Sequence, residues 1–344
     1  MPTFDTPGPI SAVIDLVVGD ARITASDRDD TVVEIRPSDA SQPQDVRVAE
    51  QTRVEYSAGR LLVTAPRQRA LSLFGRPGSI DVTIDLPSGS DVYGDASVLA
   101  FRATGRVGEC RVKTSAGDVQ LEQTGPVEVN TGAGAIAVDR AAGPAEISTG
   151  SGRIRLGQID GTAVIKNSNG DSWIGEVTGD LRVNAANGDI SVGQASADVT
   201  ASTANGAVRV GEVMRGSASL KTGLGEIEVG IHDGTAARLD VHTQFGHIRN
   251  QMDASDGPGP SDQTVEVRAR TSYGDIVIRR SGKEERWPQR PLPGPRFASP
   301  GCGSRLATRW CSMTSTSPSP RGRSSRCSAP TVPGRPPWCT SCPS

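Results

Sequence analysis

Small apolar residues alternate with polar ones along most of the chain, and glycine interrupts this alternation at regular intervals. Nine of these glycines are separated by 17, 18, 18, 18, 18, 19, 21 and 28 residues. They are Gly117, Gly134, Gly152, Gly170, Gly188, Gly206, Gly225, Gly246 and Gly274. Apolar side chains stand seven and five positions before each glycine, and a short side chain, most often threonine, stands three before it. Further apolar residues follow two and four positions after most of the glycines, so each unit is predicted to form two short strands joined by a tight turn.

The repeated unit is compatible with two architectures. A meander of hairpins is one, since pairs such as Asn169-Gly170 and Asn187-Gly188 are hairpin signals. The other is a β-solenoid, in which each unit forms one rung of a coil. Only one face of each strand is apolar, the sequence shows no amphipathic helix to cover it, and eighteen strands exceed the ~10 that open sheets usually hold. We therefore predict an all-β fold, a right-handed parallel β-solenoid (β-helix) with rungs of about 18 residues stacked in register.

Other glycines of the repeat also invite a structural interpretation. A second set follows the second strand of each unit and predicts a second corner: Gly157, Gly175, Gly193, Gly211 and Gly230. The stretches "GAGA" (132–135), "GSGR" (150–153) and "GLG" (223–225) superficially resemble nucleotide-binding loops. None completes Gly-x-Gly-x-x-Gly before a helix, so they are predicted to be corners, and no cofactor-binding residue is assigned.

The first third of the chain is rich in strands but less regular. Its candidate strands are Val13–Val18, Thr31–Arg36, Arg53–Tyr56, Leu61–Ala65 and Ser79–Leu86, with a loop from Pro66 to Gly78. Because the open end of a solenoid must be shielded, residues 1–104 are predicted to be an irregular N-terminal β cap or wider first coils. Residues 105–281 then form the repeats, and 282–344 a separate, disordered tail.

Several pieces of the chain together carry a family resemblance. They are "VVGDARITASDRDDTVVEI", "RVEYSAGRLLVTAP", "SIDVTIDLPSGSDV" and the recurring "NGDI", "GEIEV" and "YGDIVI". Over roughly residues 5 to 281 they resemble the bacterial putative-adhesin β-solenoid family, a domain of unknown function common in actinobacteria. The resemblance implies an adhesin-like role. The family has no established catalytic residues, so it assigns none here.

Charge and composition narrow the function classes. Residues 1–280 hold 27 basic and 37 acidic residues, and this acidic balance argues against nucleic acid as the partner. Cys110 is the one cysteine before residue 281, which fits a reducing compartment or a fold that needs no disulfides. The N-terminus shows no basic and apolar leader, and no run approaches 18 apolar residues, so we expect a cytoplasmic protein without membrane insertion.

The composition changes abruptly at "SGKEERW" (281–287), after which proline, arginine and cysteine follow without pattern. Codons permitted for residues 283–287 contain a ribosome-binding sequence followed by ATG. One frame over, a permitted reading of the tail reaches GPNGAGKTT, which resembles the phosphate-binding loop of an ABC-transporter ATPase. We therefore interpret residues 282–344 as out-of-frame translation of a neighbouring gene. Cys339 and Cys342 form a Cys-x-x-Cys pair without a second pair, which is a poor zinc site.

Few side chains suggest site chemistry. Three histidines occur: His232, His242 and His247. His242 and His247 could approach each other near one rung, but a metal site needs three or four convergent ligands, so both are predicted to be solvent-facing strand residues. A column of carboxylates follows the repeat glycine and raises the possibility of calcium: Asp118, Asp171, Glu226, Asp189 and Asp275. The favoured interpretation is that these side chains accept hydrogen bonds from their own turns. No catalytic, cofactor or metal residue is predicted.

Three functions follow from this pattern. The leading prediction is a non-enzymatic β-solenoid scaffold or adhesin-like module whose outward face binds an unknown protein or glycan. The second is an accessory partner of the ABC transporter inferred next door. The third is a pectin-lyase-like polysaccharide enzyme, which needs long loops over one sheet and which a convergent carboxylate–arginine cluster in a groove would favour.

Overall fold

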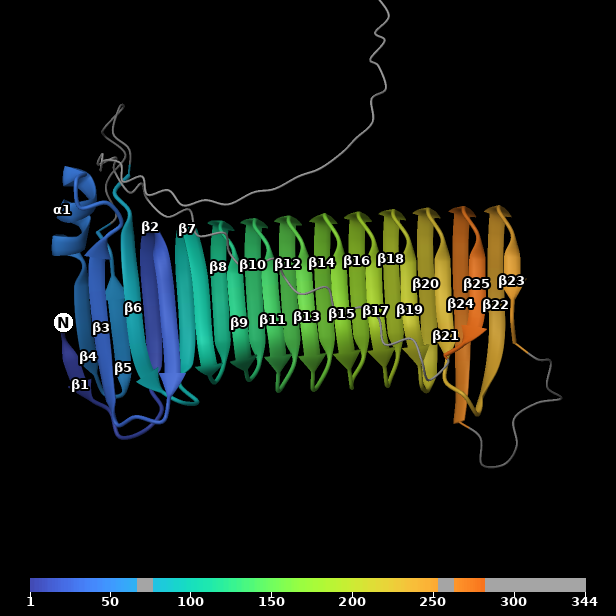
Figure 1. The fold of residues 1–344 in the computed structure, drawn as a ribbon, viewed down its shortest axis with the longest axis horizontal. Coiled ribbons are helices and arrows are strands. Elements are labelled where there is room, and N and C mark those ends of the chain that lie inside the picture. The colour runs from blue at the N-terminus through green and yellow to red at the C-terminus, as the bar shows by residue number, and fades with distance from the viewer. Residues whose placement is uncertain (67–76, 253–262, 282–344) are drawn as a thin grey trace, which may run out of the picture. The chain divides into compact units, whose positions relative to one another are not determined.

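A computed structural model of the chain describes residues 1–66, 77–252 and 263–281. Strands dominate these ranges and lie side by side along one axis (Figure 1). The all-β prediction is confirmed for this part of the chain. Most of the predicted loop at 66–78 and the whole predicted tail at 282–344 lie outside the described residues.

Each unit from Cys110 onward forms two strands, one on either side of its glycine, and equivalent strands of neighbouring units pair in parallel. Val127 of one unit lies opposite Cys110 of the unit before it and Ala145 of the unit after it. The strands that follow the glycine pair in the same way. This in-register parallel pairing confirms the β-solenoid with rungs of about 18 residues and excludes the hairpin meander for the repeats.

The bounds of these strands follow the repeat closely. They are β8 (Cys110–Ala116), β9 (Val119–Thr124), β10 (Val127–Ala133), β11 (Ile136–Ala141), β12 (Ala145–Ser151), β13 (Ile154–Ile159), β14 (Ala163–Asn169), β15 (Ser172–Val177), β16 (Leu181–Asn187), β17 (Ile190–Ala195), β18 (Val199–Asn205), β19 (Val208–Val213), β20 (Gly216–Leu224), β21 (Ile227–Ile231), β22 (Thr235–Phe245), β23 (Ile248–Asn250), β24 (Gln263–Tyr273) and β25 (Ile276–Arg280).

The hydrophobic core lies inside the coil. The predicted inward residues, such as Val112, Val119 and Ile147, are buried. Most of the threonines three positions before the glycines are buried as well, and several of their hydroxyls donate to corner carbonyls of the neighbouring rung, as Thr203 does for Gly188 at 3.3 Å. The hydroxyl donors of this column thus bond to backbone carbonyls where water is excluded, which explains why a hydroxyl recurs inside an apolar stripe.

The repeat glycines make the corners that the sequence predicts. Gly206 has a φ of 143°, in the region that favours glycine, and an added Cβ would lie 2.1 Å from the carbonyl oxygen of Gly188. Both the backbone conformation and the close stacking of corners therefore require glycine.

The second set of glycines is not at corners, and that prediction is wrong. Gly157 lies inside β13 and Gly193 lies inside β17. An added Cβ at Gly193 would lie 2.4 Å from the carbonyl oxygen of Gly175, so the close approach of stacked backbones explains these glycines. The second corners fall where one rung joins the next, for example at residues 125–126 and 142–144.

Two long strands of the N-terminal region each form a complete rung. They are β2 (Ser11–Ser26) and β7 (Asp91–Arg106), which pair in parallel along almost their whole length. On the other side of β2 lie β5 (Arg60–Thr64) and β6 (Ile80–Pro87), also parallel to it. All five strands predicted before residue 104 are present, and their order in the sheet is less regular than that of the repeats.

The cap itself is antiparallel and includes a helix. Three strands complete it: β1 (Thr3–Asp5), β3 (Asp30–Pro37) and β4 (Arg53–Ser57). The helix α1 (Pro43–Gln51) was not predicted, because its sequence is mostly polar and Val48 is its one buried apolar residue. The carboxylate of Asp45 fixes this helix by accepting the backbone N–H groups of Ser79 at 2.9 Å and Asp39 at 3.2 Å.

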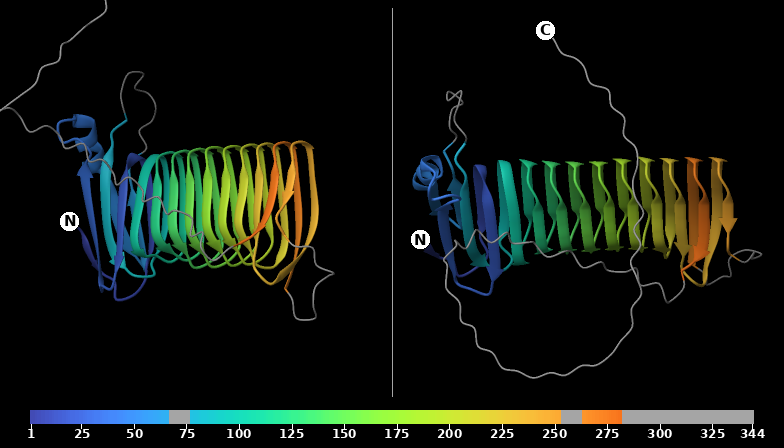
Figure 2. Two further views of the ribbon diagram at one scale, coloured as in Figure 1. Left: turned by 45° about the vertical axis from the view of Figure 1, so that its right-hand side comes forward. Right: turned by 45° about the horizontal axis from the view of Figure 1, so that its top comes forward.

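The last two rungs are stacked in the reverse of their chain order. β24 pairs with β20 on one side and with β22 on the other, and β25 likewise lies between β21 and β23. Figures 1 and 2 show β22 and β23 at the end of the row, outside β24 and β25. The sequential stacking implied by the repeat is therefore wrong at this end, because the two rungs carry the same inward pattern and either order satisfies it.

Candidate functional site

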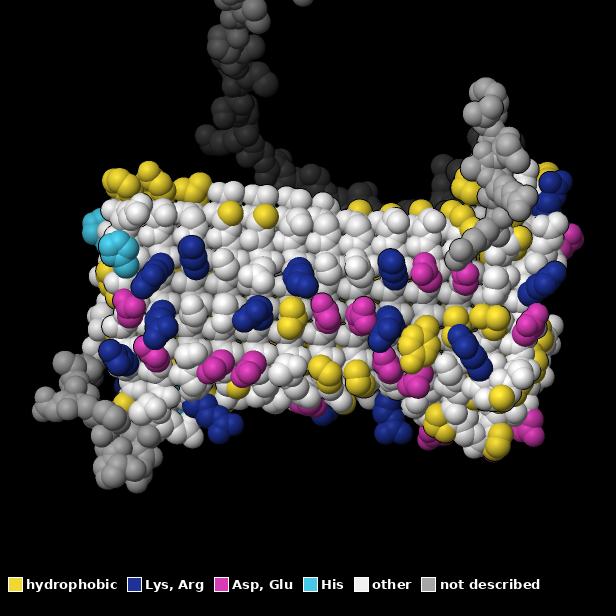
Figure 3. Space-filling model, turned by 180° about the vertical axis from the view of Figure 1, so that it is seen from behind, with side chains coloured by type: hydrophobic (Ala, Val, Ile, Leu, Met, Phe, Trp, Pro, Cys, Tyr) yellow, Lys and Arg dark blue, Asp and Glu magenta, His cyan; other side chains and the backbone are white. Residues whose placement is uncertain are grey.

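Outward side chains form straight columns along the solenoid because equivalent residues lie in register. One column on the β8, β10, β12 and β14 strands contains Arg111, Glu128, Glu146 and Val164. Figure 3 shows charged side chains arranged in such rows on one face of the molecule. Rungs are about 4.8 Å apart, so each column presents its groups at a fixed, short spacing.

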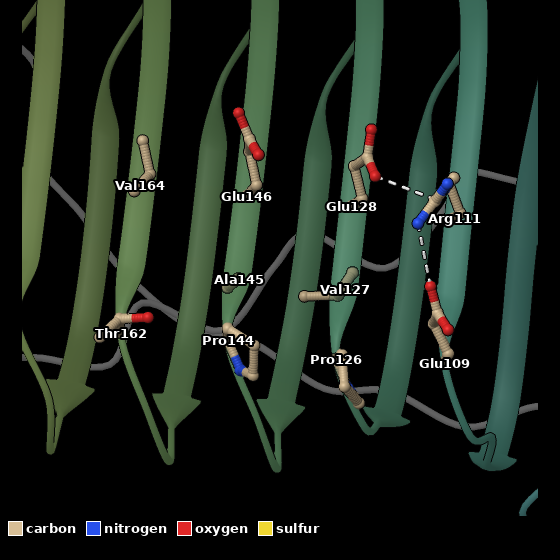
Figure 4. A pocket seen from close by; sticks show the side chains of 10 residues that line it. All are labelled: Glu109, Arg111, Pro126, Val127, Glu128, Pro144, Ala145, Glu146, Thr162 and Val164. Atoms are coloured by element: carbon tan, nitrogen blue, oxygen red, sulfur yellow. Dashed lines mark hydrogen bonds and ion pairs between the residues drawn. The ribbon is translucent and has the colours of Figure 1, made fainter.

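A shallow groove of about 310 Å³ runs beside this column (Figure 4). Arg111, Glu128 and Glu146 project from the outward faces of the strands, and Glu109, Pro126 and Pro144 stand at the corners just before these strands. We call this feature the acidic groove. Its charges come from both strands and corners, and its apolar surface comes from the two prolines at the corners.

The charges of the acidic groove are partly paired. The Arg111 guanidinium lies 3.1 Å from Glu109 Oε1 and 2.9 Å from Glu128 Oε2. Lys166 Nζ lies 3.5 Å from Glu146 Oε1 at the far end. Three carboxylates against two cations, Arg111 and Lys166, leave one negative charge in excess along the groove, which favours a positively charged ligand.

Tyr93 closes the N-terminal end of the column. It lies opposite Arg111 in register, and its hydroxyl donates to Glu109 Oε2 at 3.3 Å. Burial raises the pKa of this phenol, and the nearby carboxylates of Glu109 and Asp91 raise it further. The phenol is therefore held in its neutral form, as a donor toward the acidic groove.

Most of the carboxylates that follow the repeat glycines accept hydrogen bonds from backbone N–H groups. Asp118 Oδ1 accepts the N–H of Ala135 at 2.8 Å, and Asp189 Oδ1 accepts the N–H of Ala207 at 2.8 Å. The predicted hydrogen bonding to backbone is thus present, but the donor belongs to the next rung and not to the residue's own turn. Among the described residues no three His, Cys, Asp or Glu side chains gather as a metal site.

The histidines do not converge. His242 and His247 are both exposed, as predicted, but only His242 lies on a strand, and His247 stands in the corner between β22 and β23. His232 Nδ1 lies 2.6 Å from Glu212 Oε1, and His247 Nδ1 lies 3.6 Å from Asp275 Oδ1. His232 and His247 therefore belong to two separate contacts on the last rungs.

Cys110 is a core residue. It is fully buried at the first repeat, and burial raises the pKa of its thiol to about 12. A thiol that stays protonated and inaccessible is inert, so it serves packing. Cys339 and Cys342 lie outside the described residues.

An exposed apolar cluster lies on the last three rungs and was missed from the sequence. Leu224, Tyr273 and Phe245 lie next to one another in register, each more than half exposed. They occupy the position just before the repeat glycine, where Asn169, Asn187 and Asn205 stand earlier in the chain. Those asparagines form a ladder, with Asn187 donating to Asn169 at 2.9 Å and Asn205 donating to Asn187 at 2.8 Å.

The acidic groove was also missed, although the repeat contains its signal. Arg111, Glu128 and Glu146 all stand six positions before a repeat glycine, and the parallel register places that position in one column. Aligning the outward positions of the units, as well as the inward ones, predicts this juxtaposition.

A known family model matches nearly the same part of the chain that forms the N-terminal region and the repeats. Residues 12–281 match the family model described as Toastrack DUF4097. No curated protein matches the chain. Within the described ranges, no helix has both the length and the apolar character needed to cross a membrane. The family match spans most of the N-terminal region and every repeated unit.

Solved structures from two Parabacteroides species resemble the chain. A "putative adhesin" from Parabacteroides distasonis is 13% identical, with 80% of this chain and 95% of that one covered and a TM-score of 0.30. A "putative lipid binding protein" from the same species is 11% identical, with 81% and 95% covered and a TM-score of 0.31. A "putative adhesin" from Parabacteroides merdae is 12% identical, with 80% and 94% covered and a TM-score of 0.28.

Proposed function

The chain belongs to the Toastrack DUF4097 family, and from that membership we propose that it is a non-enzymatic binding module of adhesin-like type. Its ligand is a positively charged segment of another protein, held in the acidic groove. The solenoid is the scaffold that keeps the groove's columns straight and correctly spaced.

The acidic groove is the observation that carries this proposal. Its carboxylates on Glu109, Glu128 and Glu146 attract a cation, and Pro126 and Pro144 offer apolar contact at the corners beside them. A basic segment with an apolar residue between its charges matches both features. Electrostatic attraction of this kind mainly raises the association rate and weakens with salt.

The same groove brings carboxylates and an arginine together, which is the condition that favours a pectin-lyase-like enzyme. Binding is favoured because the three glutamate side chains are 39%, 50% and 61% exposed, and catalytic acids and bases work best where water is excluded. The corners beside the groove span two or three residues, too short to fold over it.

The test is titration of the protein with a short peptide in which lysine alternates with leucine, followed by calorimetry at low and moderate salt. We expect salt-sensitive binding that the double variant Glu128→Gln/Glu146→Gln weakens about tenfold, in line with the loss of two charge contacts. Glu176→Gln on a distant rung is the matched control and leaves binding unchanged. Binding that ignores the double substitution contradicts the proposal, and so does release of unsaturated sugars from an acidic polysaccharide.

Partnership with an ABC transporter and a cytoplasmic location remain predictions from the sequence. Both are tested by purifying the protein under native conditions from its own host and identifying what accompanies it. Recovery of a transporter ATPase supports the partnership, and its absence from repeated preparations counts against it.

A further inference from the structure

The C-terminal end of the solenoid exposes side chains that are buried in every other rung. Ile276 on β25 is fully buried, whereas its partner Ile248 on β23 is 46% exposed. Val267 on β24 is fully buried, whereas Leu239, its partner on β22, is only partly buried. An inward side chain packs against two neighbouring rungs, and within the described residues the rung of β22 and β23 has one neighbour.

The same rung presents a free strand edge. β22 pairs with β24 and β23 pairs with β25, and the described residues supply no strand on their other side. β22 is 11 residues long, and residues 235–250 contain no proline. Exposed edges of this kind are templates for pairing with another strand, and natural proteins usually protect them. The N-terminal end is protected by the antiparallel cap and α1, so the two ends differ.

The outward side of this end is apolar as well. Phe245 is 62% exposed, and its ring stacks on Tyr273 with centroids 4.8 Å apart and planes 8° from parallel. Figure 3 shows hydrophobic side chains gathered along the upper edge at this end of the molecule. Of the six exposed large hydrophobic residues in the described chain, four lie on the last three rungs: Leu224, Phe245, Ile248 and Tyr273.

The occupant of this end must match the cross-section of a rung. It needs strands on both sides of a corner and an inward apolar stripe at the same spacing. The chain beyond the described residues contains no further copy of the repeat: residues 253–262 have no large apolar residue, and residues 282–344 contain twelve prolines. Proline cannot donate to a strand ladder, so these segments are poor substitutes for a rung. A second copy of this chain carries the required surface.

We propose that two copies of the chain associate end to end through β22 and β23. A two-fold axis across the solenoid places β22 of each copy antiparallel to β22 of the other, so the edges pair and the inward stripes of the two molecules join into one core. The interface is isologous and therefore closes at a dimer, and the capped N-terminal ends point outward.

Sedimentation equilibrium of the full chain tests this proposal, with Ile248→Lys as the disrupting variant. The wild-type chain is expected at twice the mass of one chain at micromolar concentration, and Ile248→Lys at the mass of one chain, because a charge at the sealed stripe is costly. Val98→Lys is the matched control: Val98 is 44% exposed but lies on β7, so its variant stays dimeric. Phe245→Ser, at an exposed position on the outward side, is expected to weaken the dimer about tenfold.

Hydrogen exchange of the β22 amides separates the alternatives. Protection that rises with protein concentration supports the dimer. A wild-type chain that sediments as a monomer overturns the proposal, whether its β22 amides are unprotected or are protected independently of concentration. Protection in a monomer assigns the end to the chain's own residues. Equal dimerisation of Ile248→Lys and Val98→Lys, with both folded by circular dichroism, also overturns it.

Discussion

The hydroxyl of Thr243 donates to the carbonyl oxygen of Gly274 at 3.0 Å, although Gly274 lies 31 residues later in the chain. In other rungs the receiving glycine comes earlier, as Gly206 does for Thr222 and Gly225 does for Thr271. This reversal shows that the last unit of the sequence, β24 and β25, lies between the two units that precede it. β2 is likewise inserted between β6 and β7 at the other end, so both ends of the coil depart from chain order.

Engineered disulfides test the inserted order. Leu224 lies opposite Tyr273 in register, and Phe245 lies on the far side of Tyr273. With the five tail cysteines replaced by serine, Leu224→Cys/Tyr273→Cys is expected to oxidise readily, since adjacent strands bring paired Cα atoms within disulfide range. Leu224→Cys/Phe245→Cys spans two rungs and is expected to stay reduced. The opposite result, read by mass spectrometry, indicates sequential stacking.

The repeat makes most of this fold predictable, because each residue type in it indicates whether its position is a corner, a buried site or an exposed one. Glycine at a left-handed corner and threonine under a corner carbonyl recur every 18 residues, and parallel stacking is the arrangement that lets equivalent residues meet. The order of the last two rungs is not encoded in that way. Leu239, Val241 and Thr243 present the same inward pattern as Val267, Ala269 and Thr271, so long-range packing decides which unit lies outside.

The candidate site was less predictable because it depends on outward residues. Glu109 and Pro126 come from different units and are brought together at the groove by the second corner. That corner was predicted at Gly157 and Gly193, but both of these glycines lie inside strands. Outward positions vary freely between units, so the pattern alone gives little reason to single out Arg111, Glu128 and Glu146.

Replacing a corner glycine is expected to be strongly destabilising. In Gly206→Ala the new Cβ would lie 2.1 Å from the carbonyl of Gly188, at a φ of 143° that alanine rarely adopts. Strain and the forced shift of a stacked corner together cost about 3 kcal/mol of unfolding free energy. Gly8→Ala is the control, because nothing lies within 4 Å of its added Cβ. Urea denaturation measures both, and similar midpoints would contradict the argument.

Asn167 is the exception in the threonine column and offers a stabilising substitution. Its amide nitrogen donates to the carbonyl oxygens of Gly152 and Gly170, but its buried Oδ1 has no hydrogen-bond partner. Asn167→Thr removes that unpaired acceptor and keeps a donor for Gly152, so the free energy of unfolding is expected to rise by about 1 kcal/mol. The reverse change, Thr203→Asn, is expected to lower it by a similar amount. A fall in thermal midpoint for Asn167→Thr would refute this account of the column.

The attachment of the terminal rung is expected to depend on pH through Asp275. Its Oδ1 accepts the backbone N–H of His247 at 2.9 Å, which links the corner of β22 and β23 to the rung beneath. This backbone hydrogen bond lowers the pKa of Asp275, and the positive charge of Arg249 lowers it further. Since the folded pKa lies below the unfolded one, the stabilisation is present above about pH 3.9 and is lost as the pH falls through the lower, folded value.

Carboxyl-carbon NMR measures this directly. The midpoint of Asp275 is expected below about 3.9, and the amide proton of His247 is expected to shift with the same midpoint, because the bond between them weakens as the carboxylate is protonated. In Asp275→Asn the amide oxygen still accepts from His247 but carries no charge, so the shift of the His247 amide loses that titration. A midpoint above the ordinary aspartate value, or a His247 amide indifferent to it, would show that the terminal corner is held by packing instead.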